Sequence, residues 1–198
     1  MTSFVLASAS PRRRHLLSMA GFRFDVDPSE VDETFEAMDP RAQAIRLAAL
    51  KAADVSKRHP GRWVIAADTI VVFGDEQLAK PLDETDARRM LRRLSGHTHE
   101  VVTGVTLRKD TLSHEFATTT RVTFADLDDV EIDAYVATGS PMDKAGAYGI
   151  QDDLGALFIE RIDGCYYNVV GLPLHPVYAM MKQVAPELIP FGILNGQF

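Results

Sequence analysis

Residues 63–73 constrain the fold of this chain more than any other segment. They read Trp-Val-Ile-Ala-Ala-Asp-Thr-Ile-Val-Val-Phe, with no turn residue to interrupt them. Such a run of β-branched, aromatic and small apolar residues is typical of a buried strand. Asp68 stands in its middle, and a carboxylate withdrawn from water has to be paired, hydrogen-bonded or bound to a metal. We therefore expect Asp68 to meet a cation, in a structural ion pair or in a functional site.

Strand-like and helix-like segments alternate along the whole chain. Helices are predicted over residues 12–19, 40–58, 84–94, 128–137 and 172–184. Strands are predicted over residues 4–7, 22–26, 63–73 and 156–162, and an antiparallel pair over 99–108 and 116–125. The alternation predicts an α/β fold with a mixed sheet. With 198 residues, the chain suits one sizeable α/β domain or two small lobes that share a cleft.

The overall charge excludes some classes of partner. The chain has 21 basic and 28 acidic residues, and its net charge of −7 argues against general affinity for nucleic acid polymers or anionic membranes. Its single cysteine, Cys165, excludes an internal disulfide framework and fits a reducing cytoplasm. No signal peptide is recognisable, and no apolar run approaches the ~18 residues of a membrane span. We expect a cytoplasmic protein that binds neither nucleic acid polymers nor membranes.

A short loop joins the first predicted strand to the first predicted helix, with the sequence Ser8-Ala-Ser10-Pro11-Arg12-Arg13. Ser10 suits the N-cap and Pro11 the first helical position. The free backbone N–H groups and the helix dipole then favour an anion, and the two arginines add donors that match phosphate oxygens. The loop is either a phosphate site without a P-loop or a well-capped surface helix with a basic first turn.

Two lysines are further candidates for contact with a phosphate. Lys51 is the only charge in the apolar helical segment 47–53, so it either snorkels to the surface or directs its ammonium into a polar cavity. Lys80 precedes Pro81, which disfavours a helix there and holds the lysine on an extended segment. Each lysine also has an ordinary interpretation as a solvated side chain.

One acidic residue and one amide complete the set of candidates. Glu33 lies in an acidic stretch that is either a solvated loop or, with Asp68, a binding site for a hard divalent cation such as Mg²⁺. Gln151 ends the glycine-interrupted segment 143–151, and its amide can pair with a nucleobase edge through one donor and one acceptor. The alternative for this segment is a structured loop without a ligand.

Six segments together resemble the Maf family of nucleoside triphosphate pyrophosphatases, over nearly the whole chain. They are Leu6-Ala-Ser-Ala-Ser-Pro-Arg-Arg13, Ala67-Asp-Thr-Ile70, Lys80-Pro81, Ser95-Gly-His-Thr-His-Glu-Val-Val-Thr103, Asp143-Lys-Ala-Gly-Ala-Tyr-Gly-Ile-Gln151 and Tyr167-Asn-Val-Val-Gly-Leu-Pro-Leu174. Each is modest alone, but their order and spacing are specific to this family.

The resemblance implies an elongated, two-lobed fold with a central cleft, like that of the inosine triphosphate pyrophosphatases, with residues 1–198 as one Maf-like domain. It implies hydrolysis of a nucleoside triphosphate to the monophosphate and pyrophosphate, with a divalent metal cation, Mg²⁺ or Mn²⁺. It also implies a cytoplasmic homodimer that removes unwanted nucleotides, and family members have been linked to restraint of septum formation.

The resemblance also assigns roles to the candidate residues. It matches Asp68 with the acidic catalytic position of the family. On this basis we expect a catalytic set of Asp68, Lys51, Lys80 and Glu33, in which Glu33 and Asp68 place the metal and orient a water, with Asp68 as general base, metal ligand or both. We expect substrate contacts from Ser8, Ser10, Arg12, Arg13, Thr69 and Gln151. Among these, Arg12, Thr69 and Gln151 match the positions that set specificity. The intact segment 144–151 is similar to that of the branch acting on dTTP and UTP.

One departure from the family pattern follows Gln151. The next residue is usually glycine, whereas here Asp152 and Asp153 follow and add negative charge near the expected base pocket. This bears on fine specificity and not on the chemistry. Two alternatives stay open: a nucleotide-binding regulator that acts through a division partner, and the same chemistry on 7-methyl-GTP or another modified nucleotide.

Overall fold

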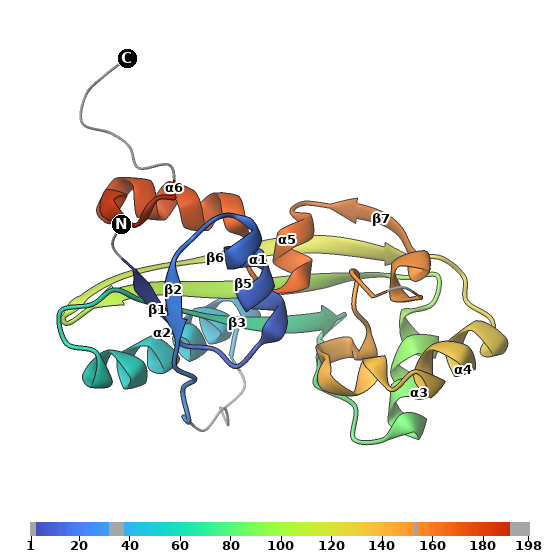
Figure 1. The fold of residues 1–198 in the computed structure, drawn as a ribbon. Coiled ribbons are helices and arrows are strands. Elements are labelled where there is room, and N and C mark those ends of the chain that lie inside the picture. Colours follow the sequence, from blue (N-terminus) through green and yellow to red (C-terminus); the bar gives the residue numbers. More distant parts are fainter. Residues whose placement is uncertain (1–2, 32–37, 153, 191–198) are drawn as a thin grey trace, which may run out of the picture. The chain divides into compact units, whose positions relative to one another are not determined.

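The computed structural model describes residues 3–31, 38–152 and 154–190 (Figure 1). The helices are α1 (Pro11–Met19), α2 (Pro40–Arg58), α3 (Glu84–Leu94), α4 (Asp129–Ala137), α5 (Tyr166–Val170) and α6 (Leu174–Val184). The strands are β1 (Phe4–Leu6), β2 (Phe24–Val26), β3 (Val64–Phe73), β4 (Glu76–Leu78), β5 (Thr98–Lys109), β6 (Leu112–Phe124) and β7 (Ile159–Asp163). Short 3₁₀ helices are η1 (Ser140–Asp143), η2 (Ala145–Ala147), η3 (Gly155–Phe158) and η4 (Pro186–Leu188). None of the described helices is long and apolar enough to cross a membrane.

Within these described residues the strands form one mixed sheet of seven strands. Their order is β2-β1-β3-β5-β6-β7, and β4 pairs with β3. β1 runs parallel to both β2 and β3, whereas β4 is antiparallel to β3 and β7 is antiparallel to β6. Only Asp110 and Thr111 connect β5 to β6, and a connection this short joins antiparallel neighbours. The predicted α/β fold with a mixed sheet is confirmed.

The chain divides into two compact units. The first comprises Met1–Asp68, Thr103–Thr118 and Gly171–Phe198, and the second comprises Thr69–Val102 and Thr119–Val170. The long strands β3, β5 and β6 each contribute residues to both units. The single cleft expected between two lobes stays a prediction.

In the first unit, α2 packs against β1 and β3. Their buried apolar side chains form one cluster, which consists of Val5, Ala7, Ala52, Val55, Val64 and Ala66. Gly104 of β5 comes so close to α2 that an added Cβ would lie 2.2 Å from the carbonyl carbon of Ala44, so only glycine permits this approach. Figure 1 shows α2 and α6 on opposite sides of the strands of this unit.

In the second unit, α3 and α4 lie side by side (Figure 1). Asp128 and Glu131 form a capping box at the start of α4. The Asp128 carboxylate accepts from the backbone N–H of Glu131, and the Glu131 carboxylate accepts from the backbone N–H of Asp128, both at 2.9 Å. Exposed ion pairs, such as Arg88 with Asp133, also join the two helices, but such pairs contribute little to stability.

Most predicted elements are present within a few residues of their expected bounds, and three details are wrong. The strand predicted over 156–162 begins only at Ile159, because Gly155 packs against the carbonyl oxygen of Gly149 and the chain turns there as η3. β4 and α5 were not predicted, since each is too short to show a period in the sequence.

Candidate functional site

The turn from β1 into α1 and the first turn of that helix carry four of the predicted substrate-binding residues. Ser10 is the N-cap of α1, where its hydroxyl accepts from the backbone N–H of Arg13 at 3.4 Å, and Pro11 begins the helix as expected. Ser8, which is buried, accepts from the backbone N–H of Ser10 at 3.3 Å. Arg12 is half-buried on the first turn of the helix.

Arg13 ties this turn to a distant part of the chain within the same unit. Its Nε donates to the carbonyl oxygen of Gly171 at 2.9 Å, and its Nη1 donates to the Ser8 hydroxyl at 3.1 Å. The Ser8 oxygen therefore accepts two hydrogen bonds, from Arg13 and from the Ser10 backbone. Both acceptor sites of the hydroxyl are then used, so its own proton is directed to a third partner. Such a preset donor suits an anion.

Asp68 meets the cation that its burial requires, and that cation is Lys51. Lys51 Nζ lies 2.7 Å from Asp68 Oδ1, and each side chain is 11% exposed. Lys51 stands on the buried stripe of α2 with Ala48, Ala52 and Val55, so it faces the sheet and does not snorkel. On β3, alternation puts Asp68 on the same face as Ala66, which belongs to the cluster packed against α2. Alternation puts Thr69 on the other face.

Parallel pairing places the serine turn near the ion pair. Leu6 of β1 lies beside Ile65 of β3, and the N–H of Ala7 donates to the Ile65 carbonyl at 2.8 Å. Ser8 lies just past the carboxyl end of β1, whereas Asp68 lies in the middle of β3, three residues beyond Ile65. In open α/β sheets ligands bind outside the carboxyl ends of the strands, and the end of β1 is such a place.

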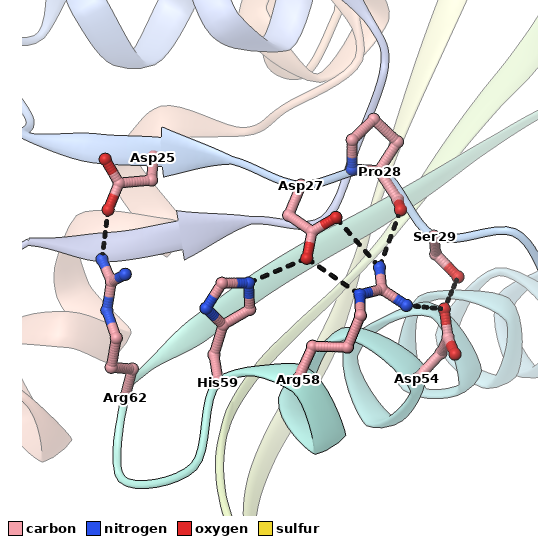
Figure 2. Close-up of polar contacts among 8 residues, drawn as sticks. All are labelled: Asp25, Asp27, Pro28, Ser29, Asp54, Arg58, His59 and Arg62. Atoms are coloured by element: carbon pink, nitrogen blue, oxygen red, sulfur yellow. Dashed lines mark hydrogen bonds and ion pairs between the residues drawn. The ribbon is translucent and has the colours of Figure 1, made fainter.

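A surface network fixes the start of the loop that leads toward Glu33. Asp27, directly after β2, accepts two hydrogen bonds from Arg58 at 2.9 and 3.1 Å and lies 2.8 Å from Nε2 of His59 (Figure 2). The bonds from Arg58, followed by the contact with His59, hold the pKa of Asp27 below its ordinary value. Ser29 donates to Asp54 of α2 at 2.9 Å, so this side of the loop is joined to the helix that carries Lys51.

Glu33 itself lies outside the described residues, and so does Asp153. Within residues 3–31, 38–152 and 154–190, no three His, Cys, Asp or Glu side chains gather as a metal-binding group. Mg²⁺ is usually held by one or two carboxylates together with substrate phosphates and water. A single buried carboxylate, Asp68 of β3, fits that donor set.

In the second unit, Lys80 follows β4 and is exposed, on a segment that is not helical. Leu78 pairs with Val71 of β3, and the carbonyl oxygen of Ala79 accepts from the N–H of Gly146 at 3.1 Å. These bonds hold the lysine's backbone beside the segment 143–151.

The same segment carries Gln151 and is anchored in the core by Tyr148. The Tyr148 hydroxyl lies 2.7 Å from Nε2 of His99, and both rings pack edge to face with Phe124. Burial lowers the pKa of His99 to about 4, so this histidine is neutral at physiological pH. Gln151 is exposed, and its Nε2 donates to Asp152 Oδ1 at 3.1 Å.

Asp152 proves to be part of a buried polar cluster. Its Oδ2 accepts from the Tyr135 hydroxyl at 2.8 Å and from the Ser140 hydroxyl at 2.6 Å, and it lies 3.2 Å from Lys144 Nζ. Asp152 therefore shares Lys144 with Asp143, because the same Nζ lies 2.7 Å from Asp143 Oδ1 and the Lys144 side chain is only 9% exposed. The sequence did not indicate Lys144 as a partner of Asp152; a buried lysine needs an anion, but its burial shows only in the structure.

The candidate residues thus form one group in each unit. The first unit brings Ser8, Ser10 and Arg13 together and places Lys51 against Asp68. The second unit holds the backbone of Lys80 beside the segment that ends in Gln151.

Comparison with known proteins identifies the family. The model of the Maf family, described as Maf-like protein, matches residues 3–184. The chain belongs to the Maf family. The family resemblance seen in the sequence is confirmed.

Curated Maf relatives are similar over most of their length. One from Koribacter versatilis, named dTTP/UTP pyrophosphatase, is 52% identical over 180 residues, which are 90% of this chain and 93% of the relative. Another of the same name, from Geobacter sulfurreducens, is 52% identical over 184 residues, which are 91% of this chain and 95% of the relative. The solved structure of the Staphylococcus aureus Ham1 protein is 20% identical with a TM-score of 0.45, and the match covers 63% of this chain and 73% of that one.

Proposed function

We propose that this protein hydrolyses nucleoside triphosphates, above all dTTP and UTP, to the monophosphate and pyrophosphate. The observation that carries the proposal is the buried Lys51–Asp68 pair, in which Asp68 lies on the strand next to the one that leads into the serine turn. Relatives 52% identical to this chain bear the name dTTP/UTP pyrophosphatase, and the segment 144–151 has the sequence typical of that branch.

The serine turn provides the phosphate contacts in this proposal. A triphosphate carries about four negative charges, so an acidic protein has to bind it in a locally basic site. The Ser8 hydroxyl accepts hydrogen bonds from Ser10 and Arg13, so it can donate its own proton to a phosphate oxygen. The N-terminus of α1 offers backbone N–H groups as further donors. Arg12 and Lys80 add positive charge, and Arg13 keeps the Ser8 hydroxyl in place.

Asp68 orients the attacking water, and Lys51 holds its carboxylate in place. Lys51 Nζ lies 2.7 Å from Asp68 Oδ1, and a carboxylate fixed in this way can accept a hydrogen bond from water. Asp68 and Glu33 would hold a Mg²⁺ or Mn²⁺ ion, and this ion would neutralise charge that develops on the phosphates. Most of the acceleration comes from positioning and electrostatics, as in phosphoryl transfer generally.

Base recognition falls to Arg12, Thr69 and Gln151 in this proposal. Gln151 is exposed and carries both a donor and an acceptor, as the edge of a pyrimidine requires. We further propose that the protein acts as a cytoplasmic homodimer in the removal of surplus nucleotides. Nucleic acid polymers and membranes are not its partners in this proposal, in keeping with the net charge of −7.

The test is pyrophosphate release from a panel of nucleoside triphosphates, with Mg²⁺ or Mn²⁺, by the wild-type protein and by Asp68→Asn. We expect metal-dependent turnover of dTTP and UTP that falls by ~10²–10⁴-fold in the variant. Turnover of 7-methyl-GTP or another modified nucleotide alone would keep the chemistry and overturn the substrate. Binding of nucleotides without turnover would instead favour a regulator of septum formation.

A further inference from the structure

The amide of Gln151 can face a base in two ways that have opposite consequences. With its oxygen toward N3 and its nitrogen toward O4, a glutamine accepts from N3–H and donates to O4, which matches uracil and thymine. After a half-turn of the amide, its oxygen accepts from the 4-amino group and its nitrogen donates to N3, which matches cytosine. The two ends of an amide have nearly the same shape. A freely rotating glutamine therefore discriminates poorly between the two bases.

In this chain the orientation of that amide is fixed by its neighbour. Gln151 Nε2 donates to Asp152 Oδ1 at 3.1 Å. An ionised carboxylate only accepts hydrogen bonds, so the nitrogen end of the amide has to be the end that faces Asp152. The amide oxygen and the second N–H of Gln151 then face a bound base in a single arrangement. The entropic cost of ordering a long exposed side chain is also met before substrate binds.

Asp152 itself is held by three groups on the opposite oxygen. Tyr135, Ser140 and Lys144 all engage Oδ2, which leaves Oδ1 for Gln151. Burial, together with the bond to Asp152, raises the pKa of the Tyr135 phenol, which therefore stays protonated and acts as a donor.

The packing around this cluster is tight enough to keep the carboxylate in place. A Cβ at position 149 would lie 2.5 Å from Asp152 Oδ2 and 2.7 Å from Lys144 Cε, so only glycine lets the chain pass between them. An exposed salt bridge contributes little, but this pair is largely enclosed, since the Asp152 side chain is 16% exposed and that of Lys144 is 9% exposed. The carboxylate is thus a rigid support for an exposed side chain.

We infer that Asp152 is a positioning residue that locks the Gln151 amide in the orientation that reads uracil and thymine and rejects cytosine. The inference rests on the proposed function, because the choice between the two orientations follows from dTTP and UTP as substrates. It gives a role to Asp152, which stands where the family pattern has a glycine. Uracil and thymine share the edge in question, so Asp152 does not discriminate between UTP and dTTP.

The test compares kcat/KM for UTP and CTP in the wild-type protein, Asp152→Ala, Asp152→Asn, Gln151→Ala and the double variant Asp152→Ala/Gln151→Ala. We expect the UTP preference to fall at least ~10-fold in both Asp152 variants, through a higher KM for UTP, since a good bidentate base contact is worth about that much discrimination or more. Asp152→Asn keeps the volume of the side chain, so it serves as the second variant if the alanine protein folds poorly. In the Gln151→Ala background, loss of Asp152 should change the preference no further.

A matched control separates positioning from general loosening of the segment. Tyr135→Phe removes one hydrogen bond to Asp152 Oδ2 and the acceptor of the Gly149 N–H, but it leaves Ser140, Lys144 and the bond to Gln151. The UTP preference should therefore stay within ~3-fold of wild type. A fall of ~10-fold in the UTP preference of Tyr135→Phe would overturn the inference. So would a further fall of that size when Asp152→Ala is added to Gln151→Ala.

The inference and the proposed function fail in distinguishable ways. A wild-type protein that prefers UTP over CTP, with a loss of less than ~10-fold in the Asp152 variants, overturns the inference and leaves the proposed function standing. Equal hydrolysis of UTP and CTP by the wild-type protein also overturns the inference. No hydrolysis of UTP or dTTP overturns the proposed function itself.

Discussion

Removal of the Asp68 charge separates the structural role of the buried ion pair from its catalytic role. Lys51 and Asp68 lie 2.7 Å apart, and each side chain is 11% exposed. Loss of one partner from such a pair leaves an uncompensated buried charge and typically costs ~3–5 kcal/mol. Asparagine keeps an acceptor oxygen in the same place, so we expect Asp68→Asn to lower the free energy of unfolding by about 2–3 kcal/mol.

The companion variant is Lys51→Met, which keeps the length of the side chain without its charge. Alone, it leaves the carboxylate of Asp68 without the ammonium, and we expect a loss of about 3–5 kcal/mol. Replacement of both charged groups by uncharged ones is often close to neutral, so the double variant Asp68→Asn/Lys51→Met should lie within about 1–2 kcal/mol of wild type. The double-mutant cycle then shows strong coupling between the two residues.

Urea denaturation followed by circular dichroism measures these stabilities, and pyrophosphate release measures turnover on the same samples. We expect the double variant to regain stability while its turnover stays ~10²–10⁴-fold low. The exposed pair of Arg121 and Asp163 provides a control, because Asp163→Asn should leave the urea midpoint unchanged. A loss of less than ~1 kcal/mol in Asp68→Asn would refute the reasoning from burial. Turnover that returns together with stability would refute a catalytic role for Asp68.

Three further predictions concern the elements that support the site. Gly104→Ala should destabilise the protein by at least ~1–3 kcal/mol in urea, because the new methyl would overlap the backbone of Ala44 at 2.2 Å. Arg13→Lys should raise the KM for dTTP about tenfold or more, since a lysine cannot hold both the Gly171 carbonyl and the serine hydroxyl beside it. Asp27→Asn should make the free energy of unfolding depend less on pH below about pH 4. The pKa of Asp27 is lower in the folded protein than in the unfolded chain, so its ionised carboxylate stabilises the fold above the unfolded pKa, and this contribution is lost as the pH falls.

Each of these predictions has a direct control. Gly61→Ala meets no atom within 4 Å, and its cost comes from the backbone alone, because φ at Gly61 is +73°. A loss in Gly104→Ala that is smaller than the loss in Gly61→Ala would contradict the packing argument. Arg14→Lys changes an exposed arginine of the same helix and should leave the KM unchanged. The urea midpoint of Asp27→Asn at pH 7 and pH 3 is compared with that of wild type, and equal losses would contradict the role of Asp27.

Local patterns of the sequence predicted the elements that carry the site. The apolar run around Asp68, the serine cap of α1 and the capping box of Asp128 and Glu131 are all present where the sequence indicated them. These features depend on residues one to four positions apart, through side-chain alternation, helical period and hydrogen bonds to the nearest free N–H groups. The resemblance to the Maf family followed from the order and spacing of short segments along the sequence.

The partners of the charged and polar groups were decided by tertiary structure. The sequence required a cation for Asp68, but only the packing of α2 on β3 supplies Lys51, 17 residues away. It could not show that Arg13 holds the carbonyl oxygen of Gly171, 158 residues away, or that Asp152 is supported through Oδ2 by Tyr135. Burial forces a charged group to find a partner whatever the fold, so the need is visible in the sequence. The identity of the partner depends on register and helix docking, which set the distance between residues far apart in the chain.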